Sequence, residues 1–369
     1  MDLIVRNLGA KEVNDAGRLV AGKVDYPISK EAYEAFQVVH SWRDAHVYPM
    51  RAFRRELKVL AEKAGVVGQT SGRLKRFQTI RGKLQRLDVK LHKMQDLAGC
   101  RIILDSIADV HSVCSLYDQG RSIHDVVKCN NYISNPKSGG YRSAHYVLKY
   151  ADRNGLVAGN ELKGEIQIRT RLQHAWATAV EAVGTVRGES LKSGQGDEIW
   201  LRFLALMSAE FAFEERCDLP QNVPQSRDVR IREIRSIERE LDAVTTLESY
   251  RKVLHKISNF SNLRGTNFLI EYNEQTRSVN VQTRHSFNRL SNAYWQAEKL
   301  DTNNAVLVEV DRVADLVSAY PNYFLDVQIF TERLRRLVEV DHSVRRDTRV
   351  LKSDEWLAQW VSRSNRGRR

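Results

Sequence analysis

The stretch Leu-Lys-Gly-Glu-Ile-Gln-Ile-Arg-Thr at residues 162–170 decides the fold of this chain. Polar and apolar residues alternate in it, which predicts a β-strand with one polar face and one face of isoleucines. Two further segments, 100–106 and 143–151, also have strand character, and helical stretches and glycine-containing loops separate all three. We therefore expect an α/β (α+β) domain built around a mixed sheet flanked by helices. The polar face of the 162–170 strand is either exposed to solvent or part of a site, and it carries Glu165, Gln167 and Arg169.

Around this sheet the sequence predicts helices before it and a domain boundary after it. Apolar residues recur at helical spacing over 29–64 and are interrupted by Pro49, which predicts two helices or one kinked helix. An amphipathic helix ends near Phe213, and the polar stretch after it holds two of the six prolines. We expect a first domain over 1–216, a linker over 217–229 and a second domain over 230–369.

The second half has the pattern of a smaller α+β domain. It predicts a long charged helix over about 227–257, a hairpin over 266–285, a helix that holds Tyr294 and Trp295, and a strand over 305–310. The tail from 361 is small, polar and basic, so we expect it to be disordered unless it contacts RNA.

Composition narrows the class of protein. No segment has the apolar length that a bilayer requires, and the N-terminus lacks the pattern of a signal peptide, so we expect a cytoplasmic protein. The four cysteines form no Cys-x-x-Cys pair, which argues against zinc and against a disulfide framework. The net charge of +12 favours a polyanionic partner, either a nucleotide or a nucleic acid.

A basic run begins at Arg73 and is a candidate phosphate site. Lys75, Thr79 and Lys83 follow it at spacings of two, four and four residues. This spacing would place a planar guanidinium beside a base and ammonium groups beside a triphosphate. A solvated basic helix is the alternative interpretation.

Two more segments are of chemical interest. Asp96 precedes a glycine turn and a strand, where a carboxylate can bind Mg²⁺, although helix caps and turns also use aspartate there. The loop at 135–145 holds paired glycines that let backbone amides approach a phosphate, and Tyr141 offers a flat face for a nucleobase. The alternative for this loop is a plain turn with Tyr141 as its packing anchor.

Taken in order, these segments resemble the motifs of the RelA/SpoT synthetase family, over roughly residues 35–215. The resemblance implies a nucleotidyltransferase-like domain that transfers pyrophosphate from ATP to a ribose 3′-hydroxyl. Under it, Arg73 and Arg101 hold the adenine, and Lys75, Thr79 and Lys83 bind the ATP phosphates. Asp96 and Glu165 hold Mg²⁺, and Glu165, aided by Gln167, removes the proton of the acceptor. Tyr141 stacks on the acceptor base, and Lys137, His145 and Arg169 complete the acceptor site.

The sequence departs from the family pattern at the acceptor side. Asn131 stands where many synthetases have aspartate, and the loop reads Ser-Gly-Gly-Tyr-Arg-Ser-Ala-His at 138–145. With the basic charge, this favours the 3′ adenosine of tRNA as acceptor, which would inhibit translation. The alternatives are GDP or GTP, which would give an alarmone, and an inactive protein that binds RNA.

A pair of tyrosines in the second half suggests that this half inhibits the activity. Tyr320 and Tyr323 resemble the Tyr-x-x-Tyr element of fused toxin–antitoxin synthetases of the CapRel type, in which a pseudo-zinc-finger domain covers the ATP site. The resemblance implies that a tyrosine ring occupies the adenine position between the two arginines. It also implies release by a phage protein, such as a capsid protein, that binds the second domain. A turn with packing aromatics is the alternative.

Overall fold

The computed structural model describes residues 8–22, 29–87, 89–151, 161–252, 265–273, 278–283, 287–299, 303–311, 315–320 and 327–339. Tyr323 and the basic tail lie outside these ranges. The strands are β1 (Gln69–Leu74), β2 (Ala98–Leu104), β3 (Asp125–Asn131), β4 (Ala144–Lys149), β5 (Lys163–Thr170), β6 (Asn267–Asn273), β7 (Ser278–Gln282) and β8 (Asn303–Val310). The α-helices are α1 (Ala10–Ala21), α2 (Lys30–Ala45), α3 (Val47–Lys63), α4 (Phe77–Arg86), α5 (Ile107–Asp118), α6 (Arg171–Arg187), α7 (Glu198–Glu214), α8 (Arg227–Leu241), α9 (Ala243–Lys252), α10 (Phe287–Lys299), α11 (Asp315–Ala319) and α12 (Gln328–Glu339). Short 3₁₀ turns lie at Leu91–Lys93 (η1) and Leu191–Ser193 (η2).

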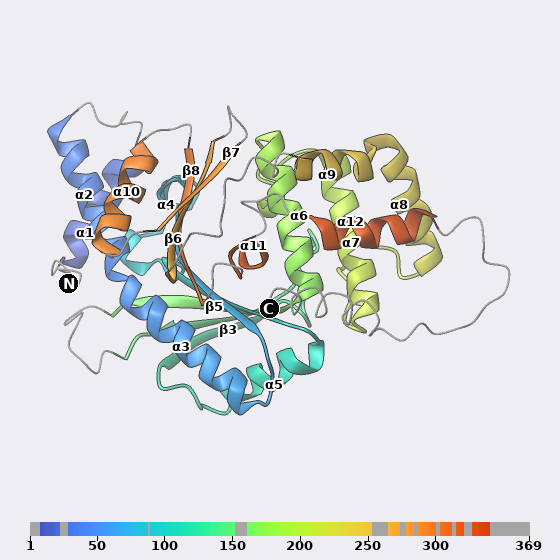
Figure 1. Ribbon diagram of the computed structural model, residues 1–369, viewed down its shortest axis with the longest axis horizontal. Coiled ribbons are helices and arrows are strands. Elements are labelled where there is room, and N and C mark those ends of the chain that lie inside the picture. The colour runs from blue at the N-terminus through green and yellow to red at the C-terminus, as the bar shows by residue number, and fades with distance from the viewer. Residues whose placement is uncertain are drawn as a thin grey trace, which may run out of the picture.

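One mixed sheet of eight strands organises the molecule, in the order β3-β4-β5-β2-β1-β8-β6-β7 (Figure 1). Strands β2 and β5 run parallel, and the other neighbours are antiparallel. The expected mixed sheet is therefore confirmed, and so are the strands predicted from 100–106, 143–151, 162–170 and 305–310. The predicted hairpin is β6 and β7.

The sheet crosses the predicted domain boundary. Strand β8 of the second half pairs with β1 of the first half, with Gly72 opposite Glu309. Backbone hydrogen bonds between β1 and β8 therefore join the two halves, in addition to the covalent connection through 217–229. The division at 217–229 stays a prediction.

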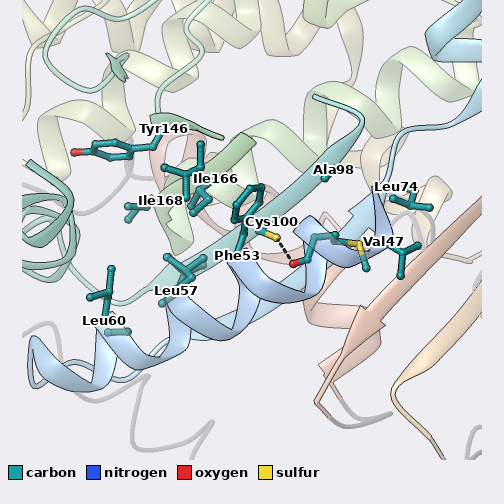
Figure 2. Packing of buried hydrophobic residues seen from close by; sticks show 14 of the residues in the cluster. Val47, Phe53, Leu57, Leu60, Leu74, Ala98, Cys100, Tyr146, Ile166 and Ile168 are labelled. Carbon is teal, nitrogen blue, oxygen red and sulfur yellow. Dashed lines mark hydrogen bonds between the residues drawn. The ribbon is translucent and has the colours of Figure 1, made fainter. Parts of the chain in front are cut away.

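Helices α3 and α5 cover one face of the sheet and enclose its largest core (Figures 1 and 2). The apolar residues of α3 recur at helical spacing and pack on Cys100, Ile166 and Ile168 of β2 and β5. The segment 29–64 forms two helices, as one of the two predicted alternatives stated. Pro49 lies in the first turn of α3, where the missing amide hydrogen costs no helical hydrogen bond.

The opposite face of the sheet divides into a polar and an apolar part. Strands β4, β5, β2 and β1 carry polar side chains there. The strand register places His145 opposite Gln167, and Gln167 opposite Arg101, so these three side chains lie on the same face. Strands β8 and β6 carry apolar side chains on which α11 and Tyr320 pack. Tyr320 therefore lies where the apolar part meets the polar one.

Helices α6, α7, α8, α9 and α12 form a separate helical layer beside the sheet (Figure 1). The prediction of one long helix over about 227–257 is wrong, because the chain turns at Asp242 between α8 and α9. Asp242 has a φ of 44°, a left-handed conformation that aspartate tolerates better than most residues. Residues 253–257 lie outside the described residues.

The second half also contacts the first away from the sheet. Helix α10, which was predicted, lies against α2, with the Arg43 guanidinium 4.3 Å from the ring centre of Tyr294. Glu309 of β8 accepts hydrogen bonds from Arg51 and Arg54 of α3 at 3.0 and 2.9 Å. Among the described residues, no helix is both long enough and apolar enough to cross a membrane.

Candidate functional site

The predicted phosphate-binding residues lie at the edge of the polar face. Arg73 is on β1, Lys75 follows the strand, and Thr79 and Lys83 lie four residues apart on α4. The interpretation of this run as one solvated helix is wrong, because it forms a strand, a turn and a short helix. This arrangement brings the ammonium groups of Lys75 and Lys83 to Asp96.

Asp96 joins two of these lysines. Its Oδ2 lies 2.9 Å from Lys75 Nζ and 3.0 Å from Lys83 Nζ. Burial alone would raise the pKa of Asp96, but the two ammonium groups outweigh it and hold the pKa below its usual value. Its Oδ1 is buried and has no hydrogen-bond partner among the described residues.

Glu165 lies at the centre of a second group. His145 Nδ1 is 3.3 Å from Glu165 Oε2, and Gln167 donates a hydrogen bond of 2.6 Å to Oε1. Burial would raise the pKa of Glu165, but the hydrogen bond and charge of His145, together with Gln167 and Lys75, lower it to about 2. The carboxylate is therefore ionised at neutral pH. Arg169 in turn donates a hydrogen bond to Gln167.

The two carboxylates suit a magnesium ion. Lys75 lowers the pKa of both, so both lie within the field of one ammonium group. No three His, Cys, Asp or Glu side chains gather as a metal cluster in the described ranges. Mg²⁺ commonly uses only one or two carboxylates together with substrate phosphates, and the free Oδ1 of Asp96 offers one such ligand.

Arg101 is in contact with the second half of the chain. Its guanidinium lies 5.2 Å from the ring centre of Tyr320 and donates a hydrogen bond to the carbonyl of Ala319. The Tyr320 hydroxyl donates a hydrogen bond of 2.7 Å to the carbonyl of Gly72, next to Arg73. The ring is 2% exposed, and this burial raises the pKa of Tyr320 to about 12, so the phenol is a neutral donor.

The predicted acceptor loop packs closely on helix α7. Gly140 has a φ of 93°, and its carbonyl accepts a hydrogen bond of 2.5 Å from Ser208. Tyr141 is 6% exposed, and its hydroxyl is hydrogen-bonded to His145 Nε2 at 2.7 Å. The Lys137 ammonium lies 5.5 Å from the Tyr141 ring centre. The loop therefore connects to Glu165 through His145.

Asn131, a departure from the family pattern, has a structural role. Its Oδ1 accepts hydrogen bonds from the amides of Ile133 and Ser134 at 3.0 and 3.2 Å. An aspartate would accept the same two bonds. The substitution therefore leaves the turn before the acceptor loop intact.

Sequence reasoning missed two parts of this site. Glu181 of α6 lies near Lys192, Arg73 and Arg76. Burial alone would raise the pKa of Glu181, but these three cations lower it to about 2. Glu215 holds the acceptor loop, since it accepts a hydrogen bond of 2.6 Å from the buried Arg142. Neither glutamate belongs to a recognisable motif, so no local pattern identified them.

Comparisons with known proteins find similarity in this region of the chain. Residues 72–184 match the model described as a region found in RelA / SpoT proteins. The GTP pyrophosphokinase YwaC of Bacillus subtilis (strain 168) is 34% identical over 119 residues, which is 30% of this chain and 55% of that protein. The GTP pyrophosphokinase YjbM of the same strain is 37% identical over 112 residues, which is 29% of this chain and 52% of that protein. The chain thus spans about half the length of these two relatives.

Among solved structures, the small alarmone synthetase 2 of Bacillus subtilis is similar at 25% identity, with a TM-score of 0.39 over 47% of this chain and 90% of that one. The residues that carry the cations, both carboxylates and the acceptor loop all fall inside the matched range. Residues 72–184, which include these side chains, thus match a region found in RelA / SpoT proteins.

Proposed function

We propose that this protein transfers the β,γ-pyrophosphate of ATP to a ribose 3′-hydroxyl. The observation that carries the proposal is the position of Lys75, which acts on both Asp96 and Glu165. Phosphate-binding cations and an ionised carboxylate are thus adjacent, as transfer from a triphosphate to a hydroxyl requires. The names of the relatives, which are GTP pyrophosphokinases, support the same chemistry.

In the proposed reaction, the acceptor 3′-oxygen bonds to the β-phosphorus of ATP. The bond from that phosphorus to the oxygen shared with the α-phosphate breaks, and AMP leaves. Lys75, Thr79 and Lys83 hold the phosphates, and Glu165 Oε receives the hydroxyl proton, with His145 beside it. A carboxylate of such low pKa is a weak base, so we expect positioning and charge to supply most of the rate. Mg²⁺ held by Asp96 and Glu165 would neutralise the charge that develops on the phosphates.

As acceptor we propose the 3′-terminal adenosine of tRNA, so that the reaction blocks translation in the cytoplasm. The net charge of +12 supports this choice, because a free nucleotide requires little positive surface beyond the site. GDP or GTP is the second candidate, and the printed names of the relatives favour it.

We propose in addition that Tyr320 inhibits the enzyme, as in CapRel-type proteins. Its ring faces Arg101 and its hydroxyl reaches the backbone beside Arg73, which are the two arginines assigned to adenine. A stacked adenine and this ring would compete for the same guanidinium. A phage protein, such as a capsid protein, would release the site by binding the second half.

One labelling experiment tests these proposals. The full chain with Tyr320→Ala is incubated with ATP labelled on its γ-phosphate and with either deacylated tRNA or GDP and GTP. We expect label in tRNA that disappears when the 3′ adenosine is removed. Label in guanosine nucleotides instead would establish the alarmone candidate, and the absence of transfer to any acceptor would contradict the proposal. Glu165→Gln in the same background is the inactive control.

A further inference from the structure

The connection between α6 and α7 carries a lysine at the border of the donor and acceptor sides. Leu191, in the short turn η2, is 4% exposed and belongs to the core of the helical layer. Gly194 and Gly196, which follow it, have positive φ values of 75° and 145°. The backbone at Lys192 is thus anchored, while its side chain is 45% exposed. A long, flexible ammonium side chain on a fixed backbone can change partners at little cost.

The Lys192 ammonium lies near a carboxylate and an aromatic ring. It lies 2.6 Å from Glu181 Oε1 and 5.9 Å from the ring centre of Tyr141. The Lys137 ammonium lies 5.5 Å from the same ring centre and 4.6 Å from that of Tyr132. Two lysines from different loops therefore converge on the aromatic ring that is expected to receive the acceptor base.

Glu181 does not depend on Lys192 alone. Arg73 and Arg76 also act on its carboxylate. The Glu181 side chain is also 32% exposed, so when Lys192 turns away the carboxylate keeps both solvent and these arginines as partners, and no buried charge is left unpaired. Lys192 can therefore exchange its contact with Glu181 for a contact with a ligand.

We propose that Lys192 binds a phosphate group of the acceptor, together with Lys137, when the acceptor base reaches Tyr141. The inference rests on the proposed function and names a further residue of its acceptor site. The groups that act on Glu165 include His145 and Lys75, whereas Lys192 acts on Glu181. Lys192 is therefore assigned to acceptor binding and not to the reacting groups.

The test measures acceptor affinity separately from turnover. All proteins are full chains with Tyr320→Ala, and the binding experiments add Glu165→Gln so that no transfer occurs. Dissociation constants are measured for guanosine, GDP and deacylated tRNA, in Lys192→Ala, Lys192→Arg and the unchanged background. Lys30→Ala is the matched control, since the Lys30 side chain is 88% exposed on α2 and its ammonium lies 3.8 Å from Glu34.

We expect Lys192→Ala to weaken the binding of a phosphate-bearing acceptor by about tenfold, the effect of losing one charged hydrogen bond. Guanosine binding should stay within twofold, and Lys192→Arg should restore most of the affinity. An effect on GDP alone indicates a nucleotide phosphate, and an effect on tRNA indicates an RNA phosphate. In turnover assays the KM for the acceptor should rise while the KM for ATP does not.

Unchanged affinity for both GDP and tRNA in Lys192→Ala would overturn the inference while leaving the proposed function in place. An equal loss of guanosine binding would also overturn it, because the effect would then not depend on phosphate. If binding weakens as expected but the Tyr320→Ala enzyme with Glu165 and Lys192 intact transfers no label to any acceptor, the proposed function fails and the phosphate contact stands.

Discussion

At the scale of single residues, the site combines ionised carboxylates with cations that have lost part of their hydration. Burial lowers the pKa of Lys75, and the charge and hydrogen bond of Asp96 offset part of this effect. Lys83 contacts the same carboxylate oxygen. Substituting Asp96 would therefore affect phosphate binding as well as metal binding, and a loss of activity alone would not separate the two roles.

A first prediction concerns the titration of Glu165. Its pKa is about 2 in the folded protein against an ordinary value of 4.5, so the ionised form stabilises the fold above pH 4.5. This contribution is lost as the pH falls from 4.5 through about 2. We expect the difference in Tm between the native protein and Glu165→Gln to decrease over that interval. The exposed Glu62 of α3 provides the matched substitution, Glu62→Gln, and a difference for Glu165→Gln that is independent of pH would contradict the prediction.

A second prediction separates the hydroxyl of Tyr320 from its ring. Tyr320→Phe removes the hydrogen bond to Gly72, worth about 1 kcal/mol, and should raise basal AMP release from ATP by about fivefold. Tyr320→Ala removes the ring over Arg101 as well and should raise it further. AMP is measured by chromatography without any added activator. Equal basal rates in all three proteins would show that Tyr320 does not restrain the enzyme.

At the scale of elements, regular patterns were predictable and long-range pairings were not. The alternation in β5 predicted which side chains share its polar face, and the register with β2 and β4 brings Arg101 and His145 to the same face. No local pattern predicted that β8 pairs with β1, because strands separated by so much sequence pair through tertiary packing. The turn at Asp242 was also missed, since the charged helical pattern continues on both sides of it.

In the site, too, residues within sequence motifs were predictable, and contacts outside the motifs were not. Motif spacing identified the lysines around Asp96 and the group around Glu165, which lie on neighbouring strands and loops. Glu181 and Lys192 escaped sequence reasoning because they form an ion pair between a helix and a loop outside every motif. A charged residue outside a motif is usually solvated, so only its position in the fold reveals its partners.

A third prediction tests the packing of the acceptor loop on α7. In Gly140→Ala, the new Cβ would lie 2.7 Å from Ser208 Cβ at a φ of 93°, so the loop must move. We expect a loss of stability of about 1–3 kcal/mol and a higher KM for the acceptor, with the KM for ATP little changed. Gly139→Ala is the matched control, because its Cβ would have no neighbour within 4 Å. If the two variants have the same Tm and the same acceptor KM, the loop is not held by this contact.

At the scale of the whole molecule, the second half is a candidate inhibitor and also contributes to the sheet and the core. The largest core contains Leu269, Tyr294 and Leu307 of the second half beside α3 and the strands of the first. Arg54 is 10% exposed at its side chain and is paired with Glu309 of β8. A complete release of the second half would leave this arginine buried without that partner. We therefore expect activation to move α11 and Tyr320 and to leave β8 in place.

A fourth prediction follows for a chain that ends at residue 216. Such a truncation removes Tyr320 but also exposes the edge of β1 and the apolar surface beneath β8 and α10. We expect the fragment to aggregate or to unfold at a lower temperature, whereas Tyr320→Ala in the full chain keeps the native Tm within a few degrees. Size-exclusion chromatography and thermal unfolding of both proteins measure this difference. A truncated chain that is monomeric and as stable as the full one would mean that the second half is a separable domain, as the linker at 217–229 suggested. Activation by withdrawal of the whole second half would then become the simpler mechanism.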